Sequence, residues 1–301
     1  MSYHDPVLLH ACVDGLRINP SGTYVDVTFG GGGHSREILK HLGPDGRLLA
    51  FDQDNDALGN VPEDDRFTLI PHNFRYLKNY LKLYKAIPVD GILADLGVSS
   101  HQFDEAGRGF SIRFDAPLDM RMNSLQDLNA AKLLESYPEE ELRRIFKEYG
   151  ELNDAGKLAR HLVNVRSDRP IKTTGQLMDL IRPFMRRGQE HSFAAQVFQS
   201  IRIEVNDELE SLRQLLLQTV EVLKPGGRLV VMSYHSLEDR LVKNFIRSGK
   251  FSGEAEKDLF GHSHVPYQSI TRKPIRPDEE ELEKNNRARS AVLRIAEKNE
   301  A

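Results

Sequence analysis

The stretch that decides the fold is Thr23-Tyr-Val-Asp-Val-Thr-Phe-Gly-Gly-Gly-Gly-His-Ser35, in which an apolar run meets four consecutive glycines. The apolar run predicts a strand over residues 23–27. Residues 34–42 follow with Ile38, Leu39 and Leu42 on one helical face, which predicts a helix. A strand, a glycine turn and a helix in this order are typical of the first unit of a parallel α/β sheet.

Strand and helix patterns also alternate before and after a central segment that has helical periodicity only. Further apolar runs predict strands over residues 47–51, 67–70, 91–96 and 228–232. Leucines at three- and four-residue steps predict a helix over residues 206–223. From about residue 104 to residue 200 only helical periodicity is found.

We therefore expect an α/β fold with a doubly wound, mostly parallel sheet that is interrupted by an all-α insert. The core is expected to comprise residues 1–103 and 201–301, and the inserted helical domain residues 104–200. Residues 249–270 are rich in Gly, Ser and His and show little periodicity, so they are expected to form a loop.

Composition narrows the class of protein. The 301 residues include 41 Lys and Arg against 45 Asp and Glu, for a formal net charge of -4. The single cysteine, Cys12, excludes a disulfide framework within the chain and a cysteine-cluster metal site. There is neither a signal-like start nor an apolar run of the ~20 residues that a membrane span needs. We expect a cytoplasmic protein that does not enter a membrane.

The glycines and the next strand predict a cofactor site. Glycines let the backbone turn tightly and approach a ligand, and the following helix offers unpaired N–H groups. Asp52 ends the next strand, about twenty residues past the glycines. A carboxylate there can accept both hydroxyls of an adenosine ribose, so a nucleotide-type cofactor is expected.

Two observations favour S-adenosylmethionine over NAD. The NAD fingerprint requires a third glycine in the first helical turn, where this chain has Ser35 or Arg36, depending on the glycine from which the count starts. Asp26, just before the glycines, suits the positive amino and sulfonium end of S-adenosylmethionine better than a pyrophosphate.

Several long blocks of the sequence form a recognisable series. They begin at Asp26, Asp90, Arg108, Phe198, Ser233 and Asn286, and read DVTFGGGGHS, DGILADLGVSS, RGFSIRFDAPLDMRM, FQSIRIEVNDEL, SYHSLEDR and NRARS. These blocks resemble the motifs of the RsmH (MraW) family, bacterial 16S rRNA cytosine-N4 methyltransferases that use S-adenosylmethionine. The resemblance covers nearly the whole chain.

The family resemblance implies a cofactor site and a substrate. Carried over by motif, the cofactor would be lined by Gly32, Gly33, His34, Asp52, Phe74, Asp95 and Gln102, with Asp52 on the ribose and Phe74 near the adenine. The target would be a cytosine in the decoding centre (P-site region) of the small ribosomal subunit. The helical insert would recognise this substrate.

Three departures from the family motifs are visible. The usual Tyr-Gly-Glu-Glu ends in Leu152, and the usual His-Pro-Ala-Thr-Arg run reads His-Ser-Phe-Ala-Ala-Gln over residues 191–196. Phe-His-Ser reads Tyr234-His235-Ser236. The first two fall in the insert, and none lies in the cofactor motifs.

Methyl transfer to an exocyclic amine needs a polar group that accepts from the amino hydrogens. Many amino-methyltransferases use Asn or Asp followed by Pro-Pro and an aromatic residue, whereas this chain has Asp95-Leu-Gly-Val98. Asp95 keeps the carboxylate, so we hypothesise that it is the central catalytic group. Asp119 and His235 are possible helpers, and His235 has an equally good interpretation as a structural residue of its loop.

Basic residues predict where RNA would bind. The insert as a whole is neutral, but residues 157–190 contain eight basic and three acidic side chains. Lys and Arg supply the attraction to phosphates. The expected RNA contacts are Arg166, Arg169, Lys172, Arg186 and Arg187. A solvated helical face is the alternative interpretation of the same charges.

Three other functions stay open. A nicotinamide-dependent dehydrogenase is opposed by the missing third glycine, and a non-catalytic ribosome-binding or assembly factor by the intact glycines, Asp52 and Asp95. DNA as a substrate is not excluded by the fold. No metal site is expected, since no histidine pair has zincin spacing. The oligomeric state does not follow from the sequence.

Overall fold

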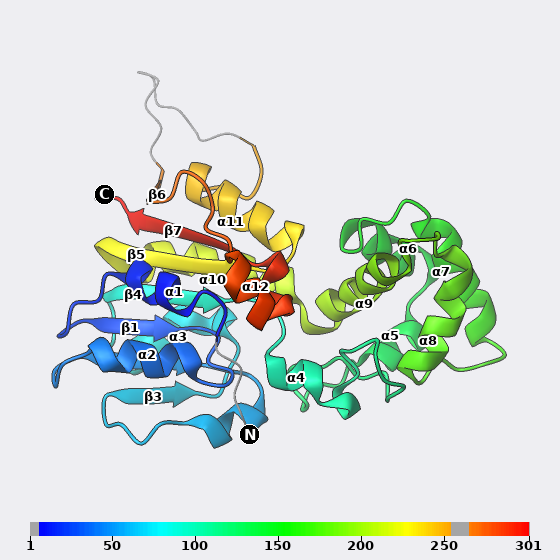
Figure 1. The fold of residues 1–301 in the computed structure, drawn as a ribbon, viewed down its shortest axis with the longest axis horizontal. Helices are drawn as coiled ribbons and strands as arrows, with labels where there is room; N and C mark the ends of the chain where they lie inside the picture. Colours follow the sequence, from blue (N-terminus) through cyan, green and yellow to red (C-terminus); the bar gives the residue numbers. More distant parts are fainter. Residues whose placement is uncertain (1–5, 254–264, 301) are drawn as a thin grey trace. The chain divides into compact units, whose positions relative to one another are not determined.

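The computed structural model describes residues 6–253 and 265–300 (Figure 1). The chain divides into two compact units. Unit 1 consists of residues 1–97 and 209–301, and unit 2 of residues 98–208. The predicted insert of residues 104–200 falls inside unit 2.

Unit 1 is built on a seven-stranded sheet with the order β3-β2-β1-β4-β5-β7-β6. Its strands are β1 (Thr23–Asp26), β2 (Arg47–Phe51), β3 (Phe67–Ile70), β4 (Val89–Asp95), β5 (Leu223–Ser233), β6 (Tyr267–Ser269) and β7 (Val292–Lys298). The first five strands in the sheet order are parallel, and β7 and β6 are antiparallel. The predicted doubly wound, mostly parallel sheet is thus confirmed.

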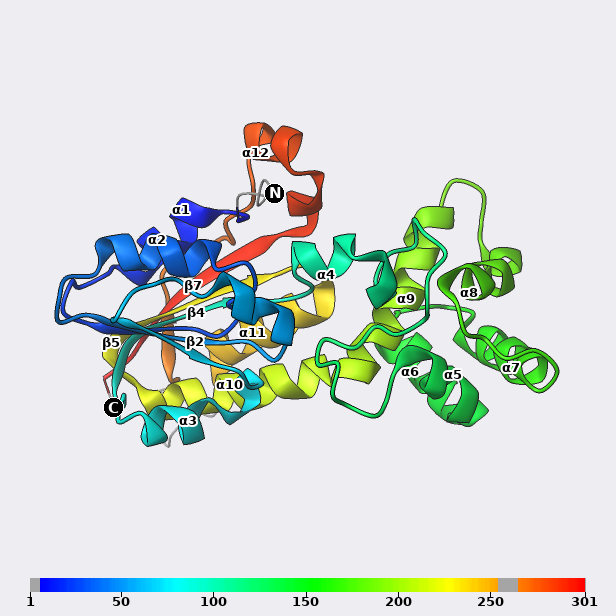
Figure 2. The ribbon, with the colours of Figure 1, turned by 90° about the horizontal axis from the view of Figure 1, so that it is seen from below.

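Helices cover both faces of this sheet (Figure 2). Helices α1 (Leu9–Leu16) and α2 (Gly33–His41) pack on one face, and α3 (Leu77–Leu83), α10 (Glu208–Val222) and α11 (Ser236–Ser248) on the other. The central strands are buried on both sides, as the continuous apolar run over residues 48–51 requires. Helix α12 (Glu279–Lys284) precedes β7.

The C-terminal part of unit 1 differs from the sequence-based expectation. Strand β5 begins at Leu223, directly after α10, and so includes residues 224–227, whereas the sequence predicted a strand only over residues 228–232. The predicted loop at 249–270 contains the edge strand β6, which pairs with β7. Partner strands distant in sequence stabilise these segments, so local patterns did not reveal them. Residues 254–264 of that loop lie outside the described residues.

Unit 2 is helical. Its helices are α4 (Ser100–Asp104), α5 (Ala130–Ser136), α6 (Glu139–Glu148), α7 (Ala155–Arg166), α8 (Thr174–Ile181) and α9 (Glu190–Asn206), with short 3₁₀ turns at 106–108 and 182–184. They share one apolar core, to which α6 contributes Leu142, Ile145 and Phe146. Throughout unit 2 the described backbone forms no strand, only an isolated bridge between Pro117 and Thr173. Among the described helices of the whole chain, none combines the length and apolar character of a membrane span.

Gly109, near the start of unit 2, has a backbone conformation and surroundings that leave no room for a side chain. Its φ is +71°, and a Cβ there would lie 2.4 Å from the Pro117 carbonyl oxygen and 2.9 Å from the Asp119 nitrogen. Both atoms belong to the backbone, which cannot move aside cheaply. We expect Gly109→Ala to destabilise unit 2 by at least about 2 kcal/mol, from the positive φ and the overlap together.

Gly107→Ala is the matched control, because its Cβ would meet only the Glu105 carboxylate, at 3.8 Å. Since the chain has no tryptophan, urea unfolding should be followed by far-ultraviolet circular dichroism and by hydrogen exchange of peptides from residues 98–208. Equal protection of the two variants would contradict the assigned backbone conformation.

Candidate active site

The glycine loop joins β1 to α2 with a bare backbone. Gly32 is the N-cap of α2 and has a φ of +75°. A Cβ on Gly32 would come within 2.8 Å of the Phe29 ring, and one on Gly33 would lie 2.2 Å from Pro6 Cγ. The lack of side chains is therefore a steric requirement at both positions. Two N–H groups of the loop are bonded within the chain: that of Gly30 donates to Asp52, and that of Gly32 donates to the Phe29 carbonyl, both at 2.7 Å.

Asp52 directly follows β2 and is fixed against this loop. Its Oδ2 accepts from the Gly30 N–H at 2.7 Å, and its Oδ1 accepts from the Asp54 N–H at 2.8 Å. Burial raises the pKa of Asp52 to about 6, against the lowering effect of these two hydrogen bonds. The negative charges of Asp54 and Asp26 add to the rise.

Asp26 ends β1 and is almost completely buried. Its carboxylate accepts from Ser35 Oγ at 2.7 Å and from the Thr28 N–H at 3.1 Å. Burial still raises the pKa of Asp26 above its ordinary value. The Thr28 hydroxyl in turn accepts from the Asp95 N–H at 2.7 Å, so the ends of β1 and β4 are joined by side chains.

Asp95 ends β4 and is contacted from two elements. The Tyr234 hydroxyl donates to its Oδ1 at 2.9 Å, and His34 Nδ1 lies 3.6 Å from its Oδ2. Burial raises the pKa of Asp95 to about 6, although His34 and Tyr234 oppose the rise. Burial also lowers the pKa of His34, against the Asp95 charge and the Val7 backbone.

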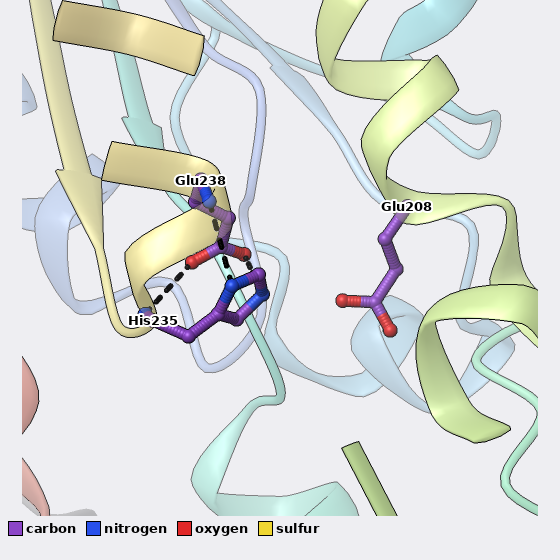
Figure 3. Close-up of side chains that lie close together, drawn as sticks. All are labelled: Glu208, His235 and Glu238. Carbon is purple, nitrogen blue, oxygen red and sulfur yellow. Dashed lines mark hydrogen bonds and ion pairs between the residues drawn. The ribbon is translucent and has the colours of Figure 1, made fainter. Parts of the chain in front are cut away.

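The other two predicted catalytic groups have structural partners. His235 is the N-cap of α11 in a capping box with Glu238. Figure 3 shows both nitrogens of its ring directed at Glu238, with Nε2 3.2 Å from Oε1. Asp119, in unit 2, accepts two hydrogen bonds from the Arg121 guanidinium, at 2.9 and 2.8 Å. Neither residue enters our proposal for catalysis.

The remaining predicted cofactor residues lie in two different places. Phe74 begins a 3₁₀ turn after β3, which Asn73 caps. The Asn73 amide donates to Gln53 at 2.9 Å, so the loop that carries Phe74 is tied to the residue after Asp52. Gln102 is buried in unit 2 and forms a capping box with Ser99 at the start of α4.

The five predicted RNA contacts separate into two kinds. The Arg166 guanidinium donates to the carbonyls of Leu134 and Tyr137, both at 2.6 Å. Arg166 therefore joins α7 to the end of α5 and has a structural role. The side chains left exposed are Arg169, Lys172, Arg186 and Arg187.

Sequence reasoning missed four residues that hold the site together: Thr28, Ser35, Asn73 and Tyr234. A hydroxyl near a buried carboxylate and an Asn before a short helical turn are recognisable patterns. The contact of Tyr234 with Asp95 had no such local signal, because the two residues are 139 positions apart.

The residues present fit S-adenosylmethionine. Asp52, Asp26 and Asp95 end the adjacent strands β2, β1 and β4, and all three carboxyl groups have raised pKa values. Negative charge at this edge thus lacks a full counter-charge. A ligand with a sulfonium and an ammonium group would supply it, whereas the pyrophosphate of NAD would add repulsion.

The effect of Asp95→Asn on the free energy of unfolding tests whether the Asp95 carboxylate is buried. The pKa of Asp95 in the folded chain, about 6, lies above its unfolded value, so its stabilising contribution is present below about pH 4 and lost as the pH rises through 6. At pH 8 we expect the variant to be more stable by about 1–2 kcal/mol. This is less than the full shift implies, because the side chain is 23% exposed. At pH 4.5 the gain should be small.

Asp64→Asn is the control, and the opposite change in stability is expected for it. The Arg66 guanidinium lowers the pKa of Asp64 to about 2, so this variant should lose stability at pH 8. Urea unfolding of the two variants at both pH values measures the effect. Equal or lower stability of Asp95→Asn at pH 8 would show that the carboxylate is solvated.

Comparison with known proteins identifies the family of the chain. Residues 1–299 match the family model described as the MraW methylase family. The protein called ribosomal RNA small subunit methyltransferase H from Christiangramia forsetii is 59% identical over 298 residues, covering 99% of this chain and 98% of that protein. Those so named from Flavobacterium johnsoniae and Bacteroides thetaiotaomicron are 58% and 54% identical, with the same coverage. The chain therefore belongs to the MraW methylase family.

Proposed function

We propose that this protein transfers a methyl group from S-adenosylmethionine to the exocyclic N4 of a cytosine in the decoding centre (P-site region) of 16S rRNA, within the small ribosomal subunit. The observation that carries the proposal is the cluster of Asp26, Asp52 and Asp95 at one sheet edge, in a chain of a methylase family. The names of relatives that match it over their whole length support the rRNA substrate. Such a substrate implies that the protein acts in the cytoplasm.

When bound, the cofactor would supply an electrophilic methyl carbon: the N4 lone pair would bond to this carbon, and the electron pair of its bond to sulfur would pass to sulfur. The protein's contribution is position and charge. In this proposal Asp52 would accept from the ribose hydroxyls, and the Gly33 N–H would donate to the ligand beside the bare backbone of Gly32. Asp95 accepts from the amino group, and the proton lost from N4 passes to its carboxylate and then to solvent.

Unit 2 supplies the RNA contacts in this proposal. The exposed basic side chains at 169, 172, 186 and 187 would bind phosphates, and the target base would have to leave its stack before it could reach Asp95. Gln102 remains a prediction as a cofactor residue from this unit, and a capping box with Ser99 fixes its side chain.

The alternatives make different predictions. An NAD-dependent dehydrogenase would bind NADH, which the carboxylate cluster disfavours. A non-catalytic ribosome-binding or assembly factor would bind subunits without needing the ionised Asp95. If DNA were the substrate, the labelled methyl group would be recovered in DNA and not in RNA.

The decisive experiment supplies methyl-labelled S-adenosylmethionine to the purified protein together with small subunits that lack the modification. Naked 16S rRNA and DNA run in parallel, and nuclease digestion identifies the labelled nucleoside. We expect N4-methylcytidine from the subunits and a loss of at least about a hundredfold for Asp95→Asn. Near-normal transfer by an Asp95→Asn protein that still binds the cofactor would disprove the role of Asp95. Label in another nucleoside would disprove the cytosine.

Cofactor affinity should depend on pH with a definite sign. Asp52 and Asp95 have pKa values of about 6, and only their ionised forms complement a cationic ligand. The dissociation constant for S-adenosylmethionine should therefore rise by about tenfold between pH 7 and pH 5. Isothermal titration calorimetry at fixed ionic strength measures it.

The variant Asp52→Asn isolates one of these two groups. It should weaken binding at pH 7.5 by about tenfold or more and flatten the pH dependence. Asp45→Asn, an exposed residue of the turn before β2, is the matched control and should change neither. An unchanged pH dependence in Asp52→Asn would remove Asp52 from the cofactor site.

The two kinds of arginine in unit 2 should respond differently to truncation. Arg187→Ala should weaken RNA binding and reduce the slope of log K against log salt by about 1 for each phosphate that is no longer neutralised, without changing stability. Arg166→Ala should lower the stability of unit 2 because it leaves two carbonyls without their donor. Filter binding over a salt series and urea unfolding separate the two effects. Equal salt slopes for Arg187→Ala and the wild type would argue for the solvated-face interpretation.

A further inference from the structure

Tyr234 contacts the proposed catalytic group although it lies 139 positions away in the chain. Its hydroxyl donates to Asp95 Oδ1 at 2.9 Å. The carboxylate on which the proposed transfer depends therefore has a donor from the segment that follows β5.

The Tyr234 ring is held in place from several sides. Its backbone N–H donates to Glu238 Oε2 at 2.9 Å, so α11 fixes the chain at this point. A Cβ on Gly97 would lie 3.3 Å from the ring carbon Cδ2, which places the ring against the backbone that follows β4. The hydroxyl is thus a positioned donor.

This donor restricts the rotation of the Asp95 carboxylate. The terminal torsion of an aspartate is broad and twofold, so the main-chain bond from the Asp95 N–H to Thr28 leaves the carboxylate free to turn. A hydrogen bond to Oδ1 selects one orientation. His34 Nδ1 lies 3.6 Å from Oδ2, which is too long for a hydrogen bond. Oδ2 therefore has more capacity than Oδ1 for a further donor.

We propose that Tyr234 is a positioning residue for methyl transfer: its hydroxyl holds the Asp95 carboxylate so that Oδ2 accepts from the amino group of the substrate. This inference rests on the proposed function. As the new C–N bond forms, one N4–H bond breaks and an Oδ2–H bond forms. The carboxylic acid then returns its proton to solvent, and Tyr234 keeps its own proton throughout.

The ionisable groups around Asp95 agree with these roles. They come from four packed elements besides β4: His34 on α2, Asp26 on β1, Tyr234 after β5 and Glu238 on α11. The negative charge of Asp95 also adds to the rise that burial causes in the pKa of Cys12 on α1. Tyr234 and His34 hold down the pKa of Asp95, whereas burial, Asp26 and Glu238 raise it. Burial and the Asp95 charge keep the pKa of Tyr234 well above its ordinary value, so its hydroxyl remains a donor.

The test compares Tyr234→Phe with Tyr267→Phe. Both variants remove one tyrosine hydroxyl from unit 1, and that of Tyr267 donates to Thr219 at 2.7 Å in the core. For Tyr234→Phe we expect kcat on small subunits to fall by about two- to tenfold, with the dissociation constant of S-adenosylmethionine within about twofold of wild type. The acidic limb of the pH–rate profile should move up by about half to one pH unit, because a bond to the charged form is lost.

The control and a double variant separate positioning from mere support of the fold. Tyr267→Phe should lower stability and leave kcat and the pH profile unchanged. In an Asp95→Asn background, Tyr234→Phe should have no further effect on kcat. An unchanged kcat and pH profile in Tyr234→Phe, or equal effects of the two tyrosine variants, would overturn the inference while the proposed function stands. Absence of methyl transfer by the wild type would overturn both.

Discussion

The constraint on which this molecule depends is the burial of negative charge at the carboxyl ends of adjacent parallel strands. Asp52, Asp26 and Asp95 end three neighbouring strands, and burial raises the pKa of each. Such carboxylates are tolerated only when donors surround them. Among these donors are Ser35, the Thr28 N–H and the Gly30 N–H, which follow β1, and the Tyr234 hydroxyl, which follows β5. The loops are therefore coupled through the acids that they hold.

This arrangement costs stability and prepares the site for a cation. A buried carboxylate with a raised pKa disfavours the folded chain near neutral pH. The same uncompensated charge favours a ligand that brings a positive sulfonium and excludes one that brings phosphates. Function and instability therefore have one electrostatic origin, a common relation in active sites. His34 offers only partial compensation, since burial lowers its own pKa.

In unit 2 the same residue type serves two purposes. Arg166 satisfies carbonyls at the end of α5, and Arg121 is paired with Asp119. Arg169, Arg186 and Arg187 instead leave their side chains exposed. A count of charges along the sequence treats all of these alike. The distinction between structural and exposed arginines depends on which carbonyls and carboxylates the fold brings within reach, which no local pattern encodes.

The sequence by itself determined the parallel α/β order, the glycine loop and the acids at the strand ends. Strand periodicity, glycine clusters and strand-end carboxylates are local, because each depends on neighbours within a few residues. Only the tertiary structure decided that β6 and β7 complete the sheet and that Tyr234 meets Asp95. These outcomes join segments that are far apart in the chain: an edge strand needs its partner, and a hydrogen bond across 139 positions needs the sheet that brings its ends together.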